Sequence, residues 1–409
     1  MLALQLAKRG VRPLLIDRAA ARGRGIAYGT DDPAHLLNVP AMKMSAWPEA
    51  QKDFAESAIL ADGAFAERRT YGDYLSGQLD RAVGQGAVTL ADGTAVSAKR
   101  TKDGWRIALA DAGTLEVDQL VLATGNGRPE PFEIPGLPED RIVQNPWGDN
   151  AKVRLAEAAA GDWPVLLIGT GLTMVDVVLT LDRLGHMGKA VAVSRRGLAP
   201  RAHQPGITPL PAPDVKEIPQ RLSDALPWLR GQGLGVDWRA AVDSLRPITQ
   251  ALWASWPDEC KARFLRHARP WWDVHRHRIA PEAAAVIDRW KDESRLTVMA
   301  ARIQDASGTH VRVKRRGDGD VQIETRLAVN CTGPAGPMEA TRNPLLRQLL
   351  DDGLVAPGEL GIGLAVDKAG RAGAGLWAVG PLTKGKWWEI TAVPDIRVQV
   401  EEVAERIAD

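Results

Sequence analysis

Apolar positions near the start of the chain follow a helical spacing first and a strand-like run next. Residues 3–9 have the helical spacing and are followed by Gly10, and residues 11–16 form a short apolar run that ends at Asp17. A helix followed directly by a buried strand is typical of the second half of a βαβ unit. The pattern therefore predicts a parallel α/β sheet at the beginning of the chain.

Two further stretches have the spacing of strands. Short alternating runs between residues 87 and 121 are separated by turn signals at Ala91-Asp92-Gly93 and Lys102-Asp103-Gly104, which predicts a β-meander leading into the apolar run 120–125. A second βαβ unit is predicted from Val165, through a helix, to Ser194. Two α/β units are therefore expected in series.

The pattern turns helical and rich in tryptophan between residues 205 and 296, and strand spacing resumes at 311–313 and 321–323. We interpret residues 205–296 as a helical insert, or cap, that interrupts the second unit. The chain ends with a predicted strand over 375–380 and a helix of about 15 residues.

The composition limits the classes of molecule that the protein is expected to bind. The 409 residues carry 52 basic and 51 acidic side chains, a net charge of +1, which gives no field that favours nucleic acid or an acidic membrane surface. The apolar runs fall far short of the roughly 20 residues that span a bilayer. Two cysteines, Cys260 and Cys331, are too far apart in sequence for a CxxC redox pair. We expect a cytoplasmic protein with a small-molecule partner, no nucleic acid and no membrane.

The second βαβ unit contains the sharpest motif. Its strand runs through Gly169 and Gly171 into a helix that starts with Leu172 and Thr173 and continues to Asp176. Such glycines allow a tight turn and a close approach of the backbone to a pyrophosphate, which the helix N-terminus then holds. Met174 stands where a third glycine is usual, so a purely structural turn remains an alternative.

The strand that follows this helix ends in Ser194, Arg195 and Arg196. An acidic residue at this place would bond the ribose hydroxyl of NAD, whereas guanidinium groups suit the 2′-phosphate of NADPH. The pattern favours NADPH, and the alternative is a solvated pair of surface arginines.

A dense basic and aromatic cluster lies in the predicted insert, and Arg276 and His277 are its best candidates for catalysis. The other members are His267, Arg269, Trp271, Trp272, His275 and Arg278. The cluster could bind an anionic group or transfer protons, because histidine titrates near neutral pH. A solvated or ion-paired face is the alternative, and a metal site is disfavoured because two histidines lack a third ligand at a suitable spacing.

The chain resembles a bacterial family of FAD/NAD(P)-binding proteins, described as FAD-dependent dehydrogenases. The resemblance covers essentially the whole chain and rests on these runs: Gly25 to Thr30, His35 to Ala41, Met44-Ser45, Tyr71 to Tyr74, Ala123 to Asn126, Asn145-Pro146-Trp147, Gly169 to Asp176, Ser194 to Gly197, Trp272 to Arg278, Asn330 to Pro334 and Trp388 to Pro394. The family is distantly similar to flavin-containing and ornithine-type N-hydroxylating monooxygenases.

The resemblance implies that FAD is bound by residues near the start and the end of the chain. By likeness the adenosine ribose lies at Asp17 and the FAD is lined by Asn38, Val39, Pro40, Met44 and Ser45. Thr124 and Gly125 would mark one crossing between domains, and residues 331–333 the other. The likeness also places residues 380–397 against the isoalloxazine, with Gly380, Trp388 and Thr391 as cofactor residues. Glu389 is a further catalytic candidate, or a helix cap.

The fold class expected from all this is α/β, with two Rossmann-like dinucleotide-binding domains and a helical insert. The FAD-binding domain would comprise residues 1–130 and 330–409, the NADPH-binding domain 150–204 and 297–329, and the insert 205–296. Because Met1 falls inside a predicted helix, we expect the first strand and glycine-rich loop of the FAD domain to be absent from these residues and to be encoded upstream.

The function expected is hydride transfer from NADPH to FAD, and then electron transfer to oxygen or to an organic acceptor, which includes a monooxygenase. The alternatives are a nucleotide-binding flavoprotein without turnover and a shortened chain that binds only NADPH. The sequence does not specify the substrate.

Overall fold

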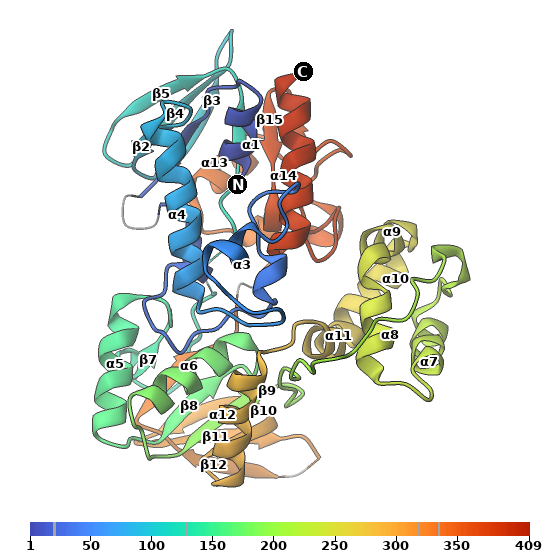
Figure 1. Cartoon of the computed structure of the whole chain (residues 1–409). Helices are drawn as coiled ribbons and strands as arrows, with labels where there is room; N and C mark the ends of the chain where they lie inside the picture. The colour runs from blue at the N-terminus through green and yellow to red at the C-terminus, as the bar shows by residue number, and fades with distance from the viewer. Residues whose placement is uncertain (19–21, 128, 318, 334–335) are drawn as a thin grey trace.

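The structure is a computed structural model that describes residues 1–18, 22–127, 129–317, 319–333 and 336–409. Figure 1 shows two α/β bodies, one above the other, with a group of helices beside them. Pro334, part of one run that carries the family resemblance, lies outside the described residues.

The upper body contains both ends of the chain. Helix α1 (Leu2–Lys8) leads to β1 (Leu14–Asp17), which pairs in parallel with β2 (Thr89–Asp92). Strand β6 (Leu120–Leu122) pairs in parallel with β15 (Leu376–Ala378), and β15 pairs antiparallel with β14 (Arg371–Gly373). Helices α1 and α14 (Val393–Ala408) lie side by side against this body (Figure 1).

The meander predicted over residues 87–121 is wrong in part. Only β3 (Ala95–Arg100), β4 (Trp105–Leu109) and β5 (Thr114–Val117) form an antiparallel sheet of consecutive strands. Strands β2 and β6 at the two ends of this stretch pair instead with β1 and β15. Their partners are distant in sequence, so local turn signals could not reveal them.

Strands β1 and β6 each leave one edge without a strand partner among the described residues. The order is β1-β2 in one sheet and β14-β15-β6 in another, so the two sheets remain separate. Further helices of the upper body are α2 (Gly25–Tyr28), α3 (Asp53–Ser57), α4 (Arg68–Gly84) and α13 (Pro344–Asp351), with the 3-10 turns η2 (Ala41–Lys43), η7 (Met338–Ala340), η8 (Glu359–Gly361) and η9 (Gly380–Thr383).

The lower body is built on a seven-stranded sheet with the order β12-β11-β10-β9-β8-β13-β7. These strands are β7 (Ile142–Val143), β8 (Val165–Ile168), β9 (Ala190–Ser194), β10 (Leu296–Ser307), β11 (His310–Arg315), β12 (Asp320–Glu324) and β13 (Leu327–Asn330). All four residues of β8 are buried, as expected of a central parallel strand covered on both faces. The predicted second βαβ unit is confirmed as β8, α6 (Leu172–Arg183) and β9.

Two more helices cover this sheet, α5 (Asp149–Ala160) and α12 (Pro281–Asp292). The apolar residues Ala283, Ala284, Ile287 and Trp290 share one face of α12 and join the buried cluster around β8 and α6. Figure 1 shows α12 beside β9 and β10 rather than with the insert. We therefore place α12 with the lower body, which would end the insert near residue 280 instead of 296.

The insert proper is a group of short helices with its own apolar core. Its elements are α7 (Leu222–Gln232), α8 (Trp238–Ser244), η5 (Arg246–Ile248), α9 (Thr249–Ser255), α10 (Asp258–Arg263), the π-helical turn η6 (Phe264–Ala268) and α11 (Arg269–Arg276). Trp388, from the C-terminal segment, is part of this core and stacks on Trp253 of α9 with a centroid separation of 4.7 Å. The insert is thus attached to the upper body by shared packing.

Candidate functional site

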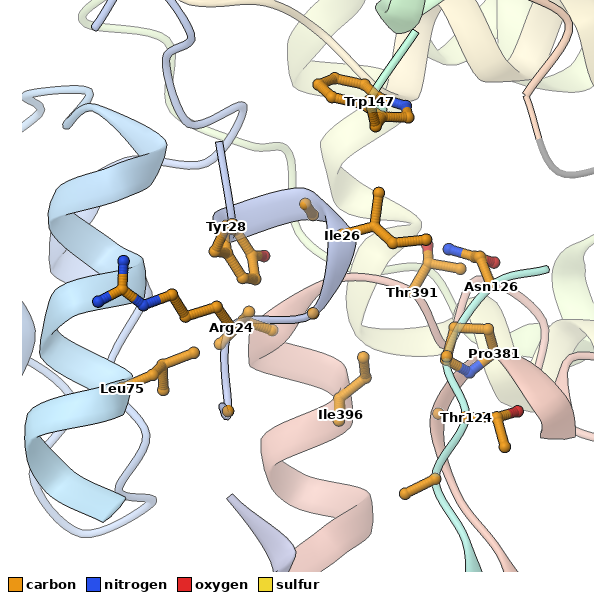
Figure 2. Close-up of a pocket in the computed structure, with 18 of the residues that line it drawn as sticks. Arg24, Ile26, Tyr28, Leu75, Thr124, Asn126, Trp147, Pro381, Thr391 and Ile396 are labelled. Carbon is orange, nitrogen blue, oxygen red and sulfur yellow. The ribbon is translucent and has the colours of Figure 1, made fainter. Parts of the chain in front are cut away.

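A cavity of about 2330 Å³ lies where the two α/β bodies and the base of the insert meet. In the part that Figure 2 shows, Ile26 of α2, Thr124 beyond β6, and Thr391 and Ile396 at the start of α14 gather around a common space. A pocket for one drug-sized ligand has about 300–1,000 Å³, so this cavity exceeds the needs of one such molecule. Its size suits two dinucleotides better.

Most of the residues predicted to bind cofactors line this cavity. They are Asp17, Asn38, Val39, Met44, Thr124, Gly125, Gly171, Leu172, Thr173, Asp176, Gly380, Trp388 and Thr391, together with the catalytic candidates Arg276, His277 and Glu389. Five segments that are far apart in the sequence, within 17–44, 124–125, 171–176, 276–277 and 380–391, are thereby brought to one place.

Several predicted residues lie away from the cavity wall. They are Pro40, Ser45, Gly169, Ser194, Arg195 and Arg196. The hydroxyl of Ser45 accepts a hydrogen bond from the Trp47 amide at 3.0 Å, so it closes a local turn. Gly169 has φ +113°, and a Cβ there would lie 2.5 Å from the carbonyl oxygen of Cys331. This glycine is required where the turn after β8 crosses the end of β13.

The carboxylate of Asp17 lies at the end of β1 and faces the cavity. Its Oδ1 accepts from the Arg18 amide at 2.9 Å, and its Oδ2 accepts from the Gly23 amide at 3.1 Å. A carboxylate has about four acceptor positions, so capacity remains for ribose hydroxyls. The position is compatible with the predicted role at an adenosine ribose.

The N-terminus of α14 meets the cavity at Thr391, Ala392 and Val393. The N-cap residue Ala392 offers no side-chain hydrogen bond. Pro394 has no N–H group and the Asp395 amide donates to the Ala392 carbonyl at 3.1 Å, so the Val393 amide is the one that the first turn leaves for another partner within the described part of the chain. A helix start of this kind favours an anionic group through its dipole. These residues fit the pyrimidine edge of a flavin, where reduction accumulates negative charge.

Glu389 is held in a buried network at the base of the insert. Its Oε2 lies 2.9 Å from Nε of Arg276 and its Oε1 lies 3.4 Å from Nε2 of His277, and only 6% of its side chain is exposed. The indole of Trp272 donates to Oε1. Burial alone would raise the pKa of this carboxyl, but the hydrogen bond from His277 and the charge of Arg276 outweigh it and lower the pKa to about 2. Glu389 is therefore ionised at neutral pH.

The backbone at Glu389 is unusual as well. Its φ of +66° lies in the left-handed region, which is strained for a residue with a β-carbon. Such outliers occur where the surrounding structure over-determines a geometry, often at functional sites. Both the backbone conformation and the contacts with Arg276 and His277 therefore indicate that the Glu389 carboxylate is held in one position.

Lys384 is a cavity residue that sequence reasoning missed. Its Nζ donates to Oδ1 of Asn126 at 3.2 Å, at the side of the cavity that Figure 2 shows beside Pro381 and Thr391. Burial lowers the pKa of Lys384 to about 8, and the charge of Arg269 acts in the same direction. The sequence signal available was its place inside the 380–397 segment, but burial of a lysine cannot be read from that.

The two arginines after β9 have different surroundings. Arg196 donates to the carbonyl oxygens of His267 and Arg266, the latter at 2.9 Å, and so binds the insert to the lower body. Arg195 is exposed and has no hydrogen bond or ion pair within the described part of the chain. Arg195 is therefore the better candidate for a 2′-phosphate.

Asp176 forms part of a clamp between the two bodies. Its carboxylate receives the guanidinium of Arg68 from α4, with both N–O distances at 2.9 Å. The neighbouring carboxylate of Asp32 accepts from Thr180 at 2.7 Å and from Arg183 at 2.8 Å, both on α6. The predicted cofactor role of Asp176 competes with this pairing, since its two oxygens are already engaged by Arg68.

The described residues contain no group of three or more His, Cys, Asp and Glu that could hold a metal ion. No helix among them is both long and apolar enough to cross a membrane.

Comparison with known proteins agrees with the architecture. The chain shares its fold with the ornithine N-hydroxylase of Kutzneria sp. 744, solved with reduced FAD, NADP+ and L-ornithine, at 16% identity and a TM-score of 0.62, over 100% of this chain and 97% of the other. The chain also shares its fold with the reduced form of the ornithine hydroxylase of Pseudomonas aeruginosa. The identity is 15% and the TM-score 0.61, over 100% of this chain and 96% of the other.

For the bacillithiol disulfide reductase of Bacillus cereus the identity is 13% and the TM-score 0.53, over 100% of this chain and 94% of the other. No curated protein matches the sequence. The expected α/β class with two Rossmann-like units is confirmed by these neighbours and by the parallel strand pairs in the sheets of both bodies. Residues 1–127 match a family model described as FAD-NAD(P)-binding, in agreement with the resemblance found in the sequence.

Proposed function

We propose that the protein is a flavin-dependent oxidoreductase that uses FAD and NADPH and passes electrons to oxygen or to an organic acceptor. One observation carries the proposal: a continuous cavity is lined both by the FAD-type segments of the upper body and by Gly171, Leu172 and Thr173 of the second nucleotide unit. When bound, NADPH supplies a hydride and FAD accepts it, and this chemistry belongs to the cofactors.

The chain's own residues would position the two cofactors. Asp17 would accept hydrogen bonds from the FAD ribose, and the uncapped start of α14 would stabilise negative charge on the flavin. The first turn of α6 after Gly171 would hold the NADPH pyrophosphate, and Arg195 would bind the 2′-phosphate.

At the reacting end, Glu389 acts as a positioning residue. Because its pKa is about 2, it carries no proton to give at neutral pH, and it holds Arg276 and His277 in place. Lys384, with a pKa of about 8, is a second group there, beside the candidate His277, that would gain and lose a proton.

A thiol-disulfide reaction, suggested by the names of some structural neighbours, receives no support from the cysteines. Cys331 is buried in the core of the lower body, and burial raises its pKa to well above neutral, while Cys260 is buried in the core of the insert. A dithiol relay needs two thiols within bonding reach and a stable thiolate. We therefore favour oxygen or a small organic acceptor.

The test is anaerobic mixing of the FAD-loaded protein with NADPH or NADH while flavin absorbance is followed. We expect faster reduction by NADPH. Arg195→Ala should remove the preference, and Arg302→Ala, at an exposed arginine of the same sheet, should not.

The acceptor is then identified by adding oxygen to the reduced protein. A long-lived absorbing species before reoxidation indicates a hydroxylase, and slow oxidation without it indicates another acceptor. Binding of FAD and NADPH without reduction would contradict the proposal and favour a nucleotide-binding protein without turnover.

A further inference from the structure

A second cavity, of about 370 Å³, lies between the insert and the start of α14. It is lined by Arg246, Pro247, Thr249 and Gln250 from the insert side, by Trp387 to Ile390, by Asp395, Val398, Gln399 and Glu402 of α14, and by Arg276. Arg276, Trp388 and Glu389 also line the large cavity, so these side chains form a shared wall. The volume falls in the range of small-molecule sites.

The wall contains an unusual concentration of polar atoms without hydrogen bonds. Four of its residues have a buried side-chain atom that lacks a hydrogen bond: Nε of Arg276, Nε1 of Trp388, Oε2 of Glu389 and Oδ2 of Asp395. The first and third of these are 2.9 Å apart but are not aligned as a hydrogen bond. Buried polar atoms in native proteins normally have a partner, so such a group of exceptions calls for a polar ligand.

Two opposite charges face this cavity without pairing. Within the described part of the chain, the guanidinium of Arg246 has no hydrogen bond or ion pair, and neither has the carboxylate of Asp395. The two are close enough for each to influence the other's ionisation, and burial lowers the pKa of Arg246 and raises that of Asp395. Both charged groups therefore lack the partner that would offset the cost of their burial.

Two other polar side chains of the cavity are engaged within the fold. Gln399 accepts from the Gly380 amide at 2.7 Å and donates to Thr383 at 2.9 Å, and the hydroxyl of Thr249 donates to the Leu245 carbonyl at 2.8 Å. Apolar surface comes from Pro247, Trp387, Trp388, Ile390 and Val398. The side chains of Gln250 and Glu402 also line the cavity without a hydrogen bond or ion pair within the described part of the chain, and Glu402 is exposed. The partly buried free charges are thus one cation, Arg246, and one anion, Asp395, set beside an apolar wall.

We propose that this cavity binds a zwitterionic α-amino acid with an apolar side chain. Its carboxylate would receive the Arg246 guanidinium, its ammonium would donate to Asp395, and its side chain would lie on the tryptophan and aliphatic wall. The proposal rests on the cavity alone and does not require the redox function to be correct.

The experiment is calorimetric titration of the 409-residue chain with L-leucine and with two molecules that each lack one charge, isocaproate and isoamylamine. L-phenylalanine serves as a second amino-acid probe with a larger side chain. We expect L-leucine or L-phenylalanine to bind with one site per chain, and each one-charge analogue of leucine to bind at least about tenfold more weakly, about 1.4 kcal/mol.

The variants separate the two charges. Arg246→Gln should weaken L-leucine and isocaproate but not isoamylamine, and Asp395→Asn should weaken L-leucine and isoamylamine but not isocaproate. Arg263→Gln is the matched control, because Arg263 is an insert arginine that is 64% exposed and lines neither cavity. Arg246→Lys, which retains the charge, and thermal unfolding of each variant distinguish a lost contact from a lost fold.

Three results would overturn the proposal. They are the absence of binding of both amino acids at millimolar concentration, binding that both charge variants leave unchanged, and isocaproate binding as tightly as L-leucine. Each can occur whether or not NADPH reduces the flavin, so failure here is distinct from failure of the proposed function.

Discussion

Replacing Glu389 with glutamine tests how strongly the buried network holds the insert on the upper body. The side chains of Glu389 and Arg276 are 6% and 10% exposed, so solvent screens their interaction little. The pKa of Glu389 falls from 4.5 to about 2, and this difference of about 2.5 units corresponds to about 3 kcal/mol. This agrees with the general cost of removing one partner of a buried ion pair, which is about 3–5 kcal/mol of stability.

The assay is hydrogen exchange of the amides of α11 and of residues 385–393, which reports local opening of the insert. A loss of about 3 kcal/mol should lower protection by about a hundredfold at pH 7. Because the folded pKa is depressed, the contribution is present above pH 4.5 and is lost as pH falls toward about 2. The variant and the wild type should therefore converge in acid.

The matched control is Glu359→Gln. Glu359 also joins the insert to the upper body, through Nζ of Lys261 at 2.8 Å, but 44% of its side chain is exposed. Exposed pairs contribute about 0–1 kcal/mol, so protection should fall by less than about fivefold. The reasoning is refuted if Glu389→Gln changes protection no more than Glu359→Gln does.

Three further predictions address the cofactor side. Arg195→Ala should lower the preference of NADPH over NADH by at least about tenfold, or 1.4 kcal/mol, in anaerobic flavin reduction, and an unchanged ratio would exclude Arg195 as the phosphate ligand. Arg68→Met should destabilise the contact between the two bodies by about 3–5 kcal/mol in urea unfolding, because it leaves the carboxylate of Asp176 buried and unpaired, and a loss under 1 kcal/mol would contradict the clamp. Burial lowers the pKa of Lys384 from 10.5 to about 8, so the free energy of unfolding should rise between pH 8 and 10.5. Lys384→Met should abolish this rise. An identical pH dependence of unfolding in both proteins would rule out the burial effect.

The sequence allowed the local elements of the second unit to be predicted, because each depends on residues close together. The strand β8, its glycine turn and the helix α6 follow from one apolar run and two glycines. The interpretation of residues 205–296 as one insert illustrates a different limit: the apolar face of α12 predicts a helix, but its pattern does not state which surface the face will contact, and it packs on the lower body. Packing partners are a property of the folded chain.

The candidate site could likewise be predicted only as far as its residue types, and not in its long-range contacts. Glu389 and Arg276 were each singled out by residue type, but their pairing joins segments that are distant in sequence. Likewise Arg195 and Arg196 were equivalent as a pattern, yet only Arg196 is engaged by the carbonyl groups of the insert. Long-range contacts decide which member of a motif is free to meet a ligand.

Trp388 belongs at once to the core of the insert and to the wall of both cavities. The insert therefore cannot lift away as a hinged lid that leaves the cavities intact, since such a movement would take the stack of Trp253 on Trp388 apart. Any ligand that depends on this wall binds the docked state and not the detached one, and so stabilises the docking of the insert in proportion to its concentration. Conversely, a substitution deep in the insert core can weaken ligand affinity without touching the ligand.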